Sequence, residues 1–203
     1  EPGKRYRVRL QLNDIAQHFP AGHRIRLALS SSYWPLVWPS PEPVTLTVYP
    51  QDSTLILPLR PPRSEDADLP ALPQPTASMP ASSTEIEPAV NESRIIHDLA
   101  SQRFTVDSVG SDGVYRLEAT NTTLEKRGHE RYTAVANDPC SCAGETHWTL
   151  GFKRGDWDVA THTRTRMTVD KDNFHIHATL EALESGAPVY EDEWHITIPR
   201  DQV

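Results

Sequence analysis

Alternation of apolar and polar residues, broken by short turns, runs through the second half of the chain and constrains its fold most. Candidate strands cover residues 103–107, 113–119, 129–135, 145–152, 157–169, 173–183 and 189–198. Successive side chains of a strand point to opposite faces, so this period predicts strands with one buried face. Short turns rich in Gly, Asp, Asn and Ser join the later strands. We therefore expect an antiparallel sheet, folded as a sandwich or a partly closed barrel. The sequence leaves one short helix over 93–101 open.

The first sixty residues show the same period. In residues 4–12, Tyr6, Val8, Leu10 and Leu12 alternate with polar residues, and the pattern returns over 24–29. Shorter candidate strands are 44–48 and 53–59. Between the first two strands, Phe19-Pro20-Ala21-Gly22 has Pro and Gly where a type I turn prefers them. No helical period is present, so the whole chain is predicted to be all-β.

Proline divides the chain. Residues 58–88 hold eight of its 18 prolines. Proline removes a backbone donor and restricts φ, which excludes helices and central strands there. We interpret residues 61–88 as a stiff linker between a first β region, 1–60, and a second β domain, 89–203.

Charge and composition exclude two classes of partner. The formal net charge is −8, and residues 64–203 carry twelve Lys and Arg against twenty-four Asp and Glu. Nucleic-acid-binding domains usually present a basic face, so an acidic domain argues against that role. No apolar run approaches the roughly 20 residues of a membrane helix. The only cysteines, Cys140 and Cys142, are too close in sequence for an unstrained disulfide. We read them as free thiols, which favours a cytoplasmic location.

Catalytic motifs are missing from the sequence. The Gly-x-Ser-x-Gly elbow of α/β hydrolases does not occur, and the nearest pattern, Gly110-Ser111-Asp112-Gly113, is interpreted as a hairpin turn. We therefore expect no catalytic residue in this chain.

The histidines of the second domain raise the question of a metal site. His175 and His177 are two residues apart, so on a strand they share one face. Imidazole is a common metal ligand. Neighbouring strands add polar and charged residues to this face, namely His162, Arg164, Arg166, Glu191, Glu193 and His195. Opposite charges paired across strands are a sufficient reason for such a polar face, because each pair stabilises the sheet by about 0.2–1 kcal/mol. We expect a polar face without metal or other cofactor, and keep a His-ligated metal site as an alternative.

The stretch Ser30-Ser31-Ser32-Tyr33-Trp34-Pro35-Leu36-Val37-Trp38-Pro39 is the most distinctive in the chain. Prolines hold two tryptophans in a rigid segment with large apolar faces. Three interpretations remain open: a platform that stacks on sugars, a surface that docks on another domain, and a crossover whose tryptophans close a core.

Residues Tyr6 to Leu59 resemble the C-terminal jelly-roll domain of the cocaine esterase and X-Pro dipeptidyl-peptidase family. The resemblance is carried by Phe19-Pro20-Ala21-Gly22-His23-Arg24-Ile25-Arg26-Leu27-Ala28-Leu29-Ser30-Ser31-Ser32 and the following Tyr33-Trp34-Pro35. It covers about a quarter of the chain directly. It implies that residues 1–60 are the C-terminal part of a jelly-roll β-sandwich, whose first strands lie upstream.

The same resemblance implies a function. Relatives carry an α/β hydrolase domain with a Ser-Asp-His triad before the jelly roll, so that upstream domain of the same polypeptide is the expected partner. A homo-oligomer is left open. Gly22 and Arg24 are expected to be framework residues, a turn glycine and a strand-borne guanidinium. Tyr33, Trp34 and Trp38 are the expected contacts with the substrate pocket or catalytic domain.

The chain would then be the non-catalytic C-terminal portion of a serine hydrolase, an X-Pro dipeptidyl-peptidase or an acyl esterase. The alternatives are a carbohydrate-binding β-sandwich module and a His-ligated metal-binding β protein.

Overall fold

The computed structural model describes residue 1 and residues 3–201. The chain divides into two compact units, residues 1–30 and 31–203. All eight strands lie in the second unit. No helix in the described ranges has the length and apolar character needed to cross a membrane. The all-β prediction is confirmed.

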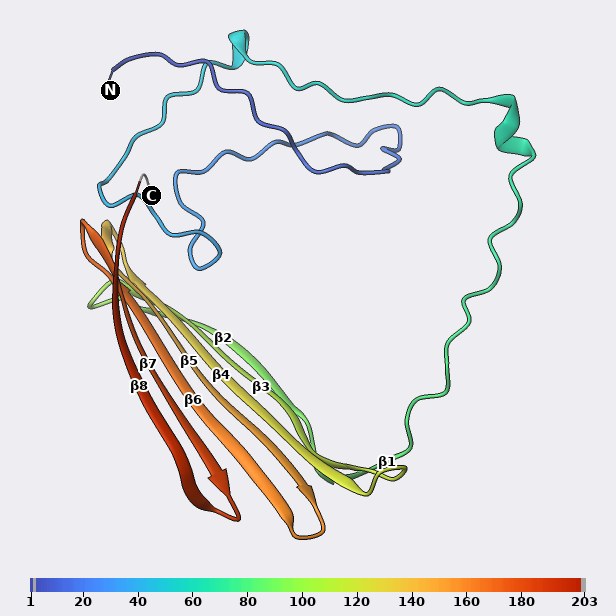
Figure 1. The fold of residues 1–203 in the computed structure, drawn as a ribbon. Coiled ribbons are helices and arrows are strands. Elements are labelled where there is room, and N and C mark those ends of the chain that lie inside the picture. The colour runs from blue at the N-terminus through green and yellow to red at the C-terminus, as the bar shows by residue number, and fades with distance from the viewer. Residues whose placement is uncertain (2, 202–203) are drawn as a thin grey trace. The chain divides into compact units, whose positions relative to one another are not determined.

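A single antiparallel sheet makes up residues 83–199 (Figure 1). Its strands are β1 Ser83–Glu87, β2 Val90–Asp98, β3 Arg103–Leu117, β4 Thr122–Val135, β5 Asp138–Arg154, β6 Trp157–Val169, β7 Asn173–Glu184 and β8 Ala187–Pro199. From β3 to β8 each strand pairs with the next, while β1 and β2 both pair with β3. The predicted antiparallel meander is thus confirmed, and the sheet is open and not closed into a barrel.

The candidate strands at 103–107 and 113–119 are one strand, β3, because a β-bulge carries the chain through Gly110-Ser111-Asp112-Gly113. The pairing with β4 shifts between Ser111 and Gly113, and Gly113 has a φ of +76°. A Cβ on Gly113 would lie 2.2 Å from the carbonyl oxygen of Glu87. The interpretation of this segment as a hairpin turn was wrong, since glycine permits a bulge with the same positive φ.

The short helix left open over 93–101 is absent. Residues 90–98 form β2, which pairs with β3 from Val90–Ser111 to Asp98–Arg103. A continuous backbone ladder outweighs the weak helical preference of this segment, because tertiary pairing overrides local propensity.

Residues 1–60 contain no strand among the described positions, so the candidate strands 4–12, 24–29, 44–48 and 53–59 are absent from this structure. An alternating sequence specifies two faces, but a strand also needs a partner ladder, and the described chain supplies none here. The turn before His23 is present: His23 N donates to the carbonyl oxygen of Pro20 over 3.1 Å. Gly22 is its third residue with a φ of +87°, which indicates a type II turn in place of the expected type I. Arg24 follows it in an exposed position.

Two 3-10 turns, Pro50–Asp52 and Ser64–Ala67, are the other regular elements before β1. β1 begins at Ser83, within the Pro-rich stretch expected to be a linker. The predicted division at residues 60 and 89 stays a prediction.

The sheet has one polar and one apolar face. On the polar face a single row crosses β2 to β8 through Arg94, Asp107, Arg131, Glu145, Arg166, His177 and His195. On the opposite face a neighbouring row passes through Ile95, Val106, Tyr132, Gly144, Met167, Ile176 and Ile196. The partition of β7 and β8 into polar and apolar sides follows the predicted alternation.

Very little of this sheet is buried. Cys142 and Val169 are the buried apolar residues among those described, and Ile95 and Ile196 are 79% and 46% exposed. A sheet with one apolar face normally packs that face against a second layer. Within the described part of the second unit, no second sheet covers the apolar face.

Candidate functional site

The predicted Tyr33, Trp34 and Trp38 lie in a tight turn in the second unit. Val37 N donates to the carbonyl oxygen of Tyr33 over 2.9 Å, and the Trp34–Pro35 peptide bond is cis. The turn brings the rings of Trp34 and Trp38 together, with centroids 4.3 Å apart and planes inclined by 54°. Both rings are half-buried, whereas Tyr33 is 64% exposed.

The two tryptophans attach this turn to one end of the sheet. Trp34 meets the ring of Tyr132 edge-on at 6.0 Å, and Trp38 meets Phe174 at 5.3 Å. Edge-to-face aromatic pairs contribute about 0.5–1.5 kcal/mol beyond their buried area. Arg200 donates to the carbonyl oxygen of the buried Pro39. These three contacts join residues that are 98 to 161 positions apart in sequence, which no local pattern reveals.

This geometry bears on the interpretation of the Trp segment as a platform that stacks on sugars. A sugar platform needs coplanar, exposed rings, and an angle of 54° between half-buried rings does not provide them. Trp34 and Trp38 contact Tyr132 and Phe174 of the sheet, while the Tyr33 ring is exposed.

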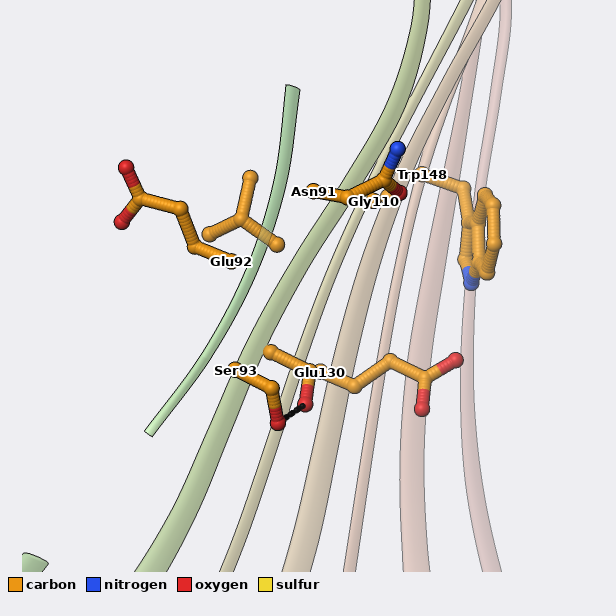
Figure 2. A pocket seen from close by; sticks show the side chains of 9 residues that line it. Asn91, Glu92, Ser93, Gly110, Glu130 and Trp148 are labelled. Carbon is orange, nitrogen blue, oxygen red and sulfur yellow. Dashed lines mark hydrogen bonds between the residues drawn. The ribbon is translucent and has the colours of Figure 1, made fainter. Parts of the chain in front are cut away.

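A shallow trough lies further along the apolar face, between β2 and β5 (Figure 2). In the register, Asn91, Gly110, Gly128 and Trp148 follow one another across these four strands. The Trp148 ring lies over Gly128, since a Cβ on Gly128 would come within 2.6 Å of its Cζ3 atom. Ser93, Ser108 and Glu130 add polar groups to the lining. The sequence interpretation missed this trough, because it placed Gly110 in a turn and Gly128 just before a candidate strand. A glycine inside a strand marks a place where another group approaches the backbone closely.

Carboxylates on the polar face form hydrogen-bonded pairs with histidine and arginine side chains. Arg131 Nε and His129 Nε2 lie 2.9 and 2.8 Å from Oδ1 of Asp107, and together they lower the pKa of Asp107, with the His129 bond as the larger cause. On β5, hydrogen bonds from His147 and Arg164 lower the pKa of Glu145, with the His147 bond as the larger cause. Carboxylates held ionised by hydrogen bonds stabilise the sheet, and their lowered pKa makes them poor general acids.

Cys142 and Ser111 are the buried side chains with a thiol or hydroxyl group among the described residues of the sheet. Burial is the main cause that raises the pKa of Cys142 to about 11, so almost no thiolate forms near neutral pH. Both cysteines are free, as expected. Ser111 is buried, and its hydroxyl donates to the carbonyl oxygen of Lys126 while it accepts from Gly113 N. These bonds hold the Ser111 hydroxyl within the β3 bulge.

Comparison with known families finds a match for the first part of the chain. Residues 1–79 match the X-Pro dipeptidyl-peptidase C-terminal non-catalytic domain family. The predicted relation to X-Pro dipeptidyl-peptidases is thereby confirmed for this region, which ends just before β1. No curated protein and no solved structure matches the chain. The sheet of residues 83–199 therefore lies outside the matched region.

Proposed function

We propose that the chain is a non-catalytic accessory region of a serine hydrolase of the X-Pro dipeptidyl-peptidase or acyl-esterase type. Its partner in this proposal is the α/β hydrolase domain of the same polypeptide, against which it packs and whose substrate pocket it helps to shape. The match of residues 1–79 to a non-catalytic peptidase domain carries the proposal. Two free thiols suit a cytoplasmic protein.

Exposed apolar side chains support the need for a partner. In residues 1–60, Val8, Leu10 and Ile56 are 72%, 71% and 79% exposed. These residues belong to the candidate strands 4–12 and 53–59, so packing of those strands in a completed sheet would bury them. The uncovered apolar side of the sheet adds a second surface of the same character. Apolar surface contributes about 25 cal/mol for each Å² buried, which favours association over solvent exposure.

Tyr33 is the residue we assign to the contact with the hydrolase domain. Trp34 and Trp38 hold the turn on the sheet, and the Tyr33 ring extends from that anchored turn. A rigid aromatic side chain on a fixed support loses little conformational entropy when it binds.

The proposal is tested by producing the chain and the hydrolase domain separately and mixing them. We expect the chain alone to hydrolyse neither p-nitrophenyl esters nor X-Pro anilides, and the mixture to elute as one complex with raised kcat/KM. Tyr33→Ala should weaken the complex. Trp157→Ala is the matched control, because this exposed tryptophan lies at the β5–β6 turn. Sustained turnover by the chain alone, or absence of a complex, would overturn the proposal.

A carbohydrate-binding module is the second candidate, and the Trp148 trough is the feature that favours it. Its lining combines an indole ring with amide, hydroxyl and carboxylate groups. Retardation on polysaccharide gels, lost in Trp148→Ala but kept in Trp34→Ala, would support this candidate. Equal mobility with and without polysaccharide would eliminate it.

A further inference from the structure

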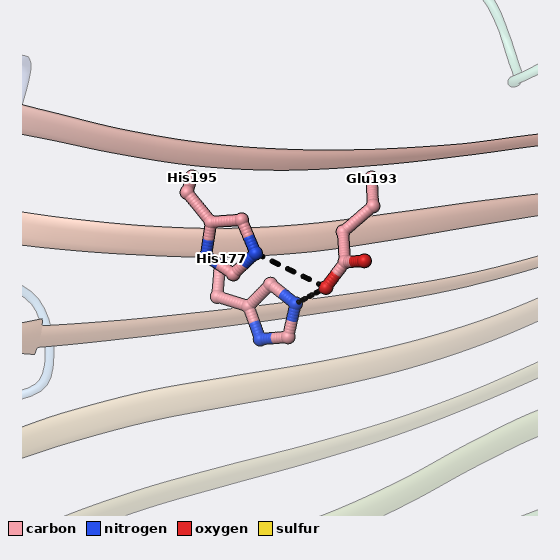
Figure 3. A group of neighbouring side chains, drawn as sticks. All are labelled: His177, Glu193 and His195. Carbon is pink, nitrogen blue, oxygen red and sulfur yellow. Dashed lines mark hydrogen bonds and ion pairs between the residues drawn. The ribbon is translucent and has the colours of Figure 1, made fainter.

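Two histidines converge on one carboxylate oxygen at the β8 edge of the sheet (Figure 3). His177 Nε2 lies 2.6 Å from Oε1 of Glu193, and His195 Nε2 lies 3.1 Å from the same atom. The two imidazole rings are stacked, with centroids 4.4 Å apart and planes inclined by 10°. The three ligand atoms all lie within 4.8 Å of one another.

The backbone produces this convergence. His177 and His195 are direct partners in the β7–β8 register, so their side chains leave the same face side by side. Glu193 precedes His195 by two residues on β8 and therefore shares that face. Its register partner is Thr179, whose short side chain leaves the carboxylate free to reach towards both rings.

We propose that His177, Glu193 and His195 bind one divalent transition-metal ion, with zinc as the best-suited probe. Zinc is bound by His nitrogen and carboxylate oxygen at about 2.0–2.2 Å, so its ligand atoms lie about 3.3 Å apart in a tetrahedral site. The observed separations of 2.6 and 3.1 Å are close to that spacing, and small rotations of the exposed side chains reach it. Water completes the coordination, because three protein ligands leave a position open.

A second histidine pair shows that the convergence is not a general property of this face. His129 and His147 are also direct register partners, on β4 and β5. Their rings are 6.3 Å apart, and each bonds its own carboxylate, Asp107 and Glu145. That arrangement offers no common point for a metal, whereas the β7–β8 arrangement does.

The neighbouring charges are compatible with a cation. Arg166 of β6 is the register partner of His177, but it is exposed and its charge is screened by solvent. Arg164 donates to Glu145 over 2.6 Å, which directs its charge away from Glu193. The bound ion would join the terminal strand β8 to β7 and so protect an edge of the sheet.

Calorimetric titration of the tag-free, chelator-treated chain with zinc chloride tests the site. We expect one equivalent to bind with a dissociation constant on the order of micromolar. His177→Ala and His195→Ala should each weaken binding at least about tenfold, while His129→Ala, the matched control, leaves it unchanged. Zinc should also raise the Tm of the wild type and of His129→Ala, but not of His177→Ala.

Each other outcome overturns the assignment. No saturable binding up to roughly 1 mM zinc would show that the cluster is only a hydrogen-bonded pair of imidazoles. Binding that survives His177→Ala, or that falls equally in His129→Ala, would place the metal elsewhere. Circular dichroism of each variant verifies that the sheet is intact, and His177→Gln, which keeps a polar side chain, replaces any alanine variant that fails to fold.

Discussion

Gly128→Ala should destabilise the sheet because Trp148 occupies the space of the missing side chain. The added Cβ would lie 2.6 Å from Cζ3 of the indole, and 2.7 and 2.9 Å from two further ring atoms. Carbon atoms in contact are about 3.5–4.0 Å apart, so the ring must move outwards by about 1 Å or leave its place.

The magnitude follows from how much of the indole is covered. Overpacking of this kind costs about 1–3 kcal/mol. Complete loss of the ring contact sets the upper limit. Trp148 is 38% exposed, so somewhat more than half of its surface is covered. That covered part corresponds to about 120 Å² and about 3 kcal/mol. For a domain of this size the expected decrease in Tm is about 4–12 °C.

Gly110→Ala is the matched control. Gly110 is the register partner of Gly128 on β3, but its added Cβ would meet nothing closer than Oδ1 of Asn91 at 3.9 Å. Replacing a glycine by alanine without strain stabilises a protein by up to about 1 kcal/mol, because alanine lowers the conformational entropy of the unfolded chain. Urea unfolding followed by circular dichroism should therefore rank Gly110→Ala at or above the wild type and Gly128→Ala well below it.

A double-mutant cycle isolates the contact. In the Trp148→Ala background the Gly128→Ala substitution should cost almost nothing, because the ring that it displaces is gone. Equal free energies of unfolding for Gly128→Ala and Gly110→Ala, within about 0.5 kcal/mol, would refute the packing of Trp148 on Gly128.

Two further predictions concern ionisable groups. Burial raises the pKa of Cys142 to about 11, so its thiol should react slowly. The variant Cys140→Ser keeps only Cys142, and it should react with Ellman's reagent at pH 8 at least about tenfold more slowly than Cys142→Ser, which keeps only Cys140. Equal rates in the two variants would contradict the burial of Cys142. Because hydrogen bonds from His129 and Arg131 lower the folded pKa of Asp107, its stabilising contribution is complete above its unfolded pKa of about 3.9 and is lost as the pH falls through the lowered folded value. We expect the free energy of unfolding in urea to fall less between pH 6 and pH 3 in Asp107→Asn, which lacks this contribution, than in the exposed control Asp112→Asn, which keeps it. The same decrease in both variants would reject the pairing of Asp107 with His129 and Arg131.

The alternating pattern of β6, β7 and β8 sufficed to predict these strands and their two faces. Turn residues such as Asp170 and Gly186 mark where these strands end. Oδ1 of Asp170 accepts hydrogen bonds from the backbone N–H groups of Asp172 and Asn173, and Gly186 has a φ of +78°. Such signals are local, so they can be read without knowledge of the fold.

Local signals failed where a distant strand decided the conformation. The period of residues 4–12 is as regular as that of β7, yet only β7 has a described ladder on each side. In the same way, the bulge at Gly113 is visible only once Glu87 is known to lie beside it.

Sequence alone therefore determined the all-β class, the polar and apolar sides of the last strands and the relation of the first part to a peptidase domain, because side-chain period and motif are local properties. Tertiary structure alone decided that Trp34 and Trp38 contact the sheet, that Trp148 lies over Gly128 and that His177 and His195 share Glu193. Those contacts depend on strand register and on chain segments far apart in sequence, and register is set by the pairing of whole strands.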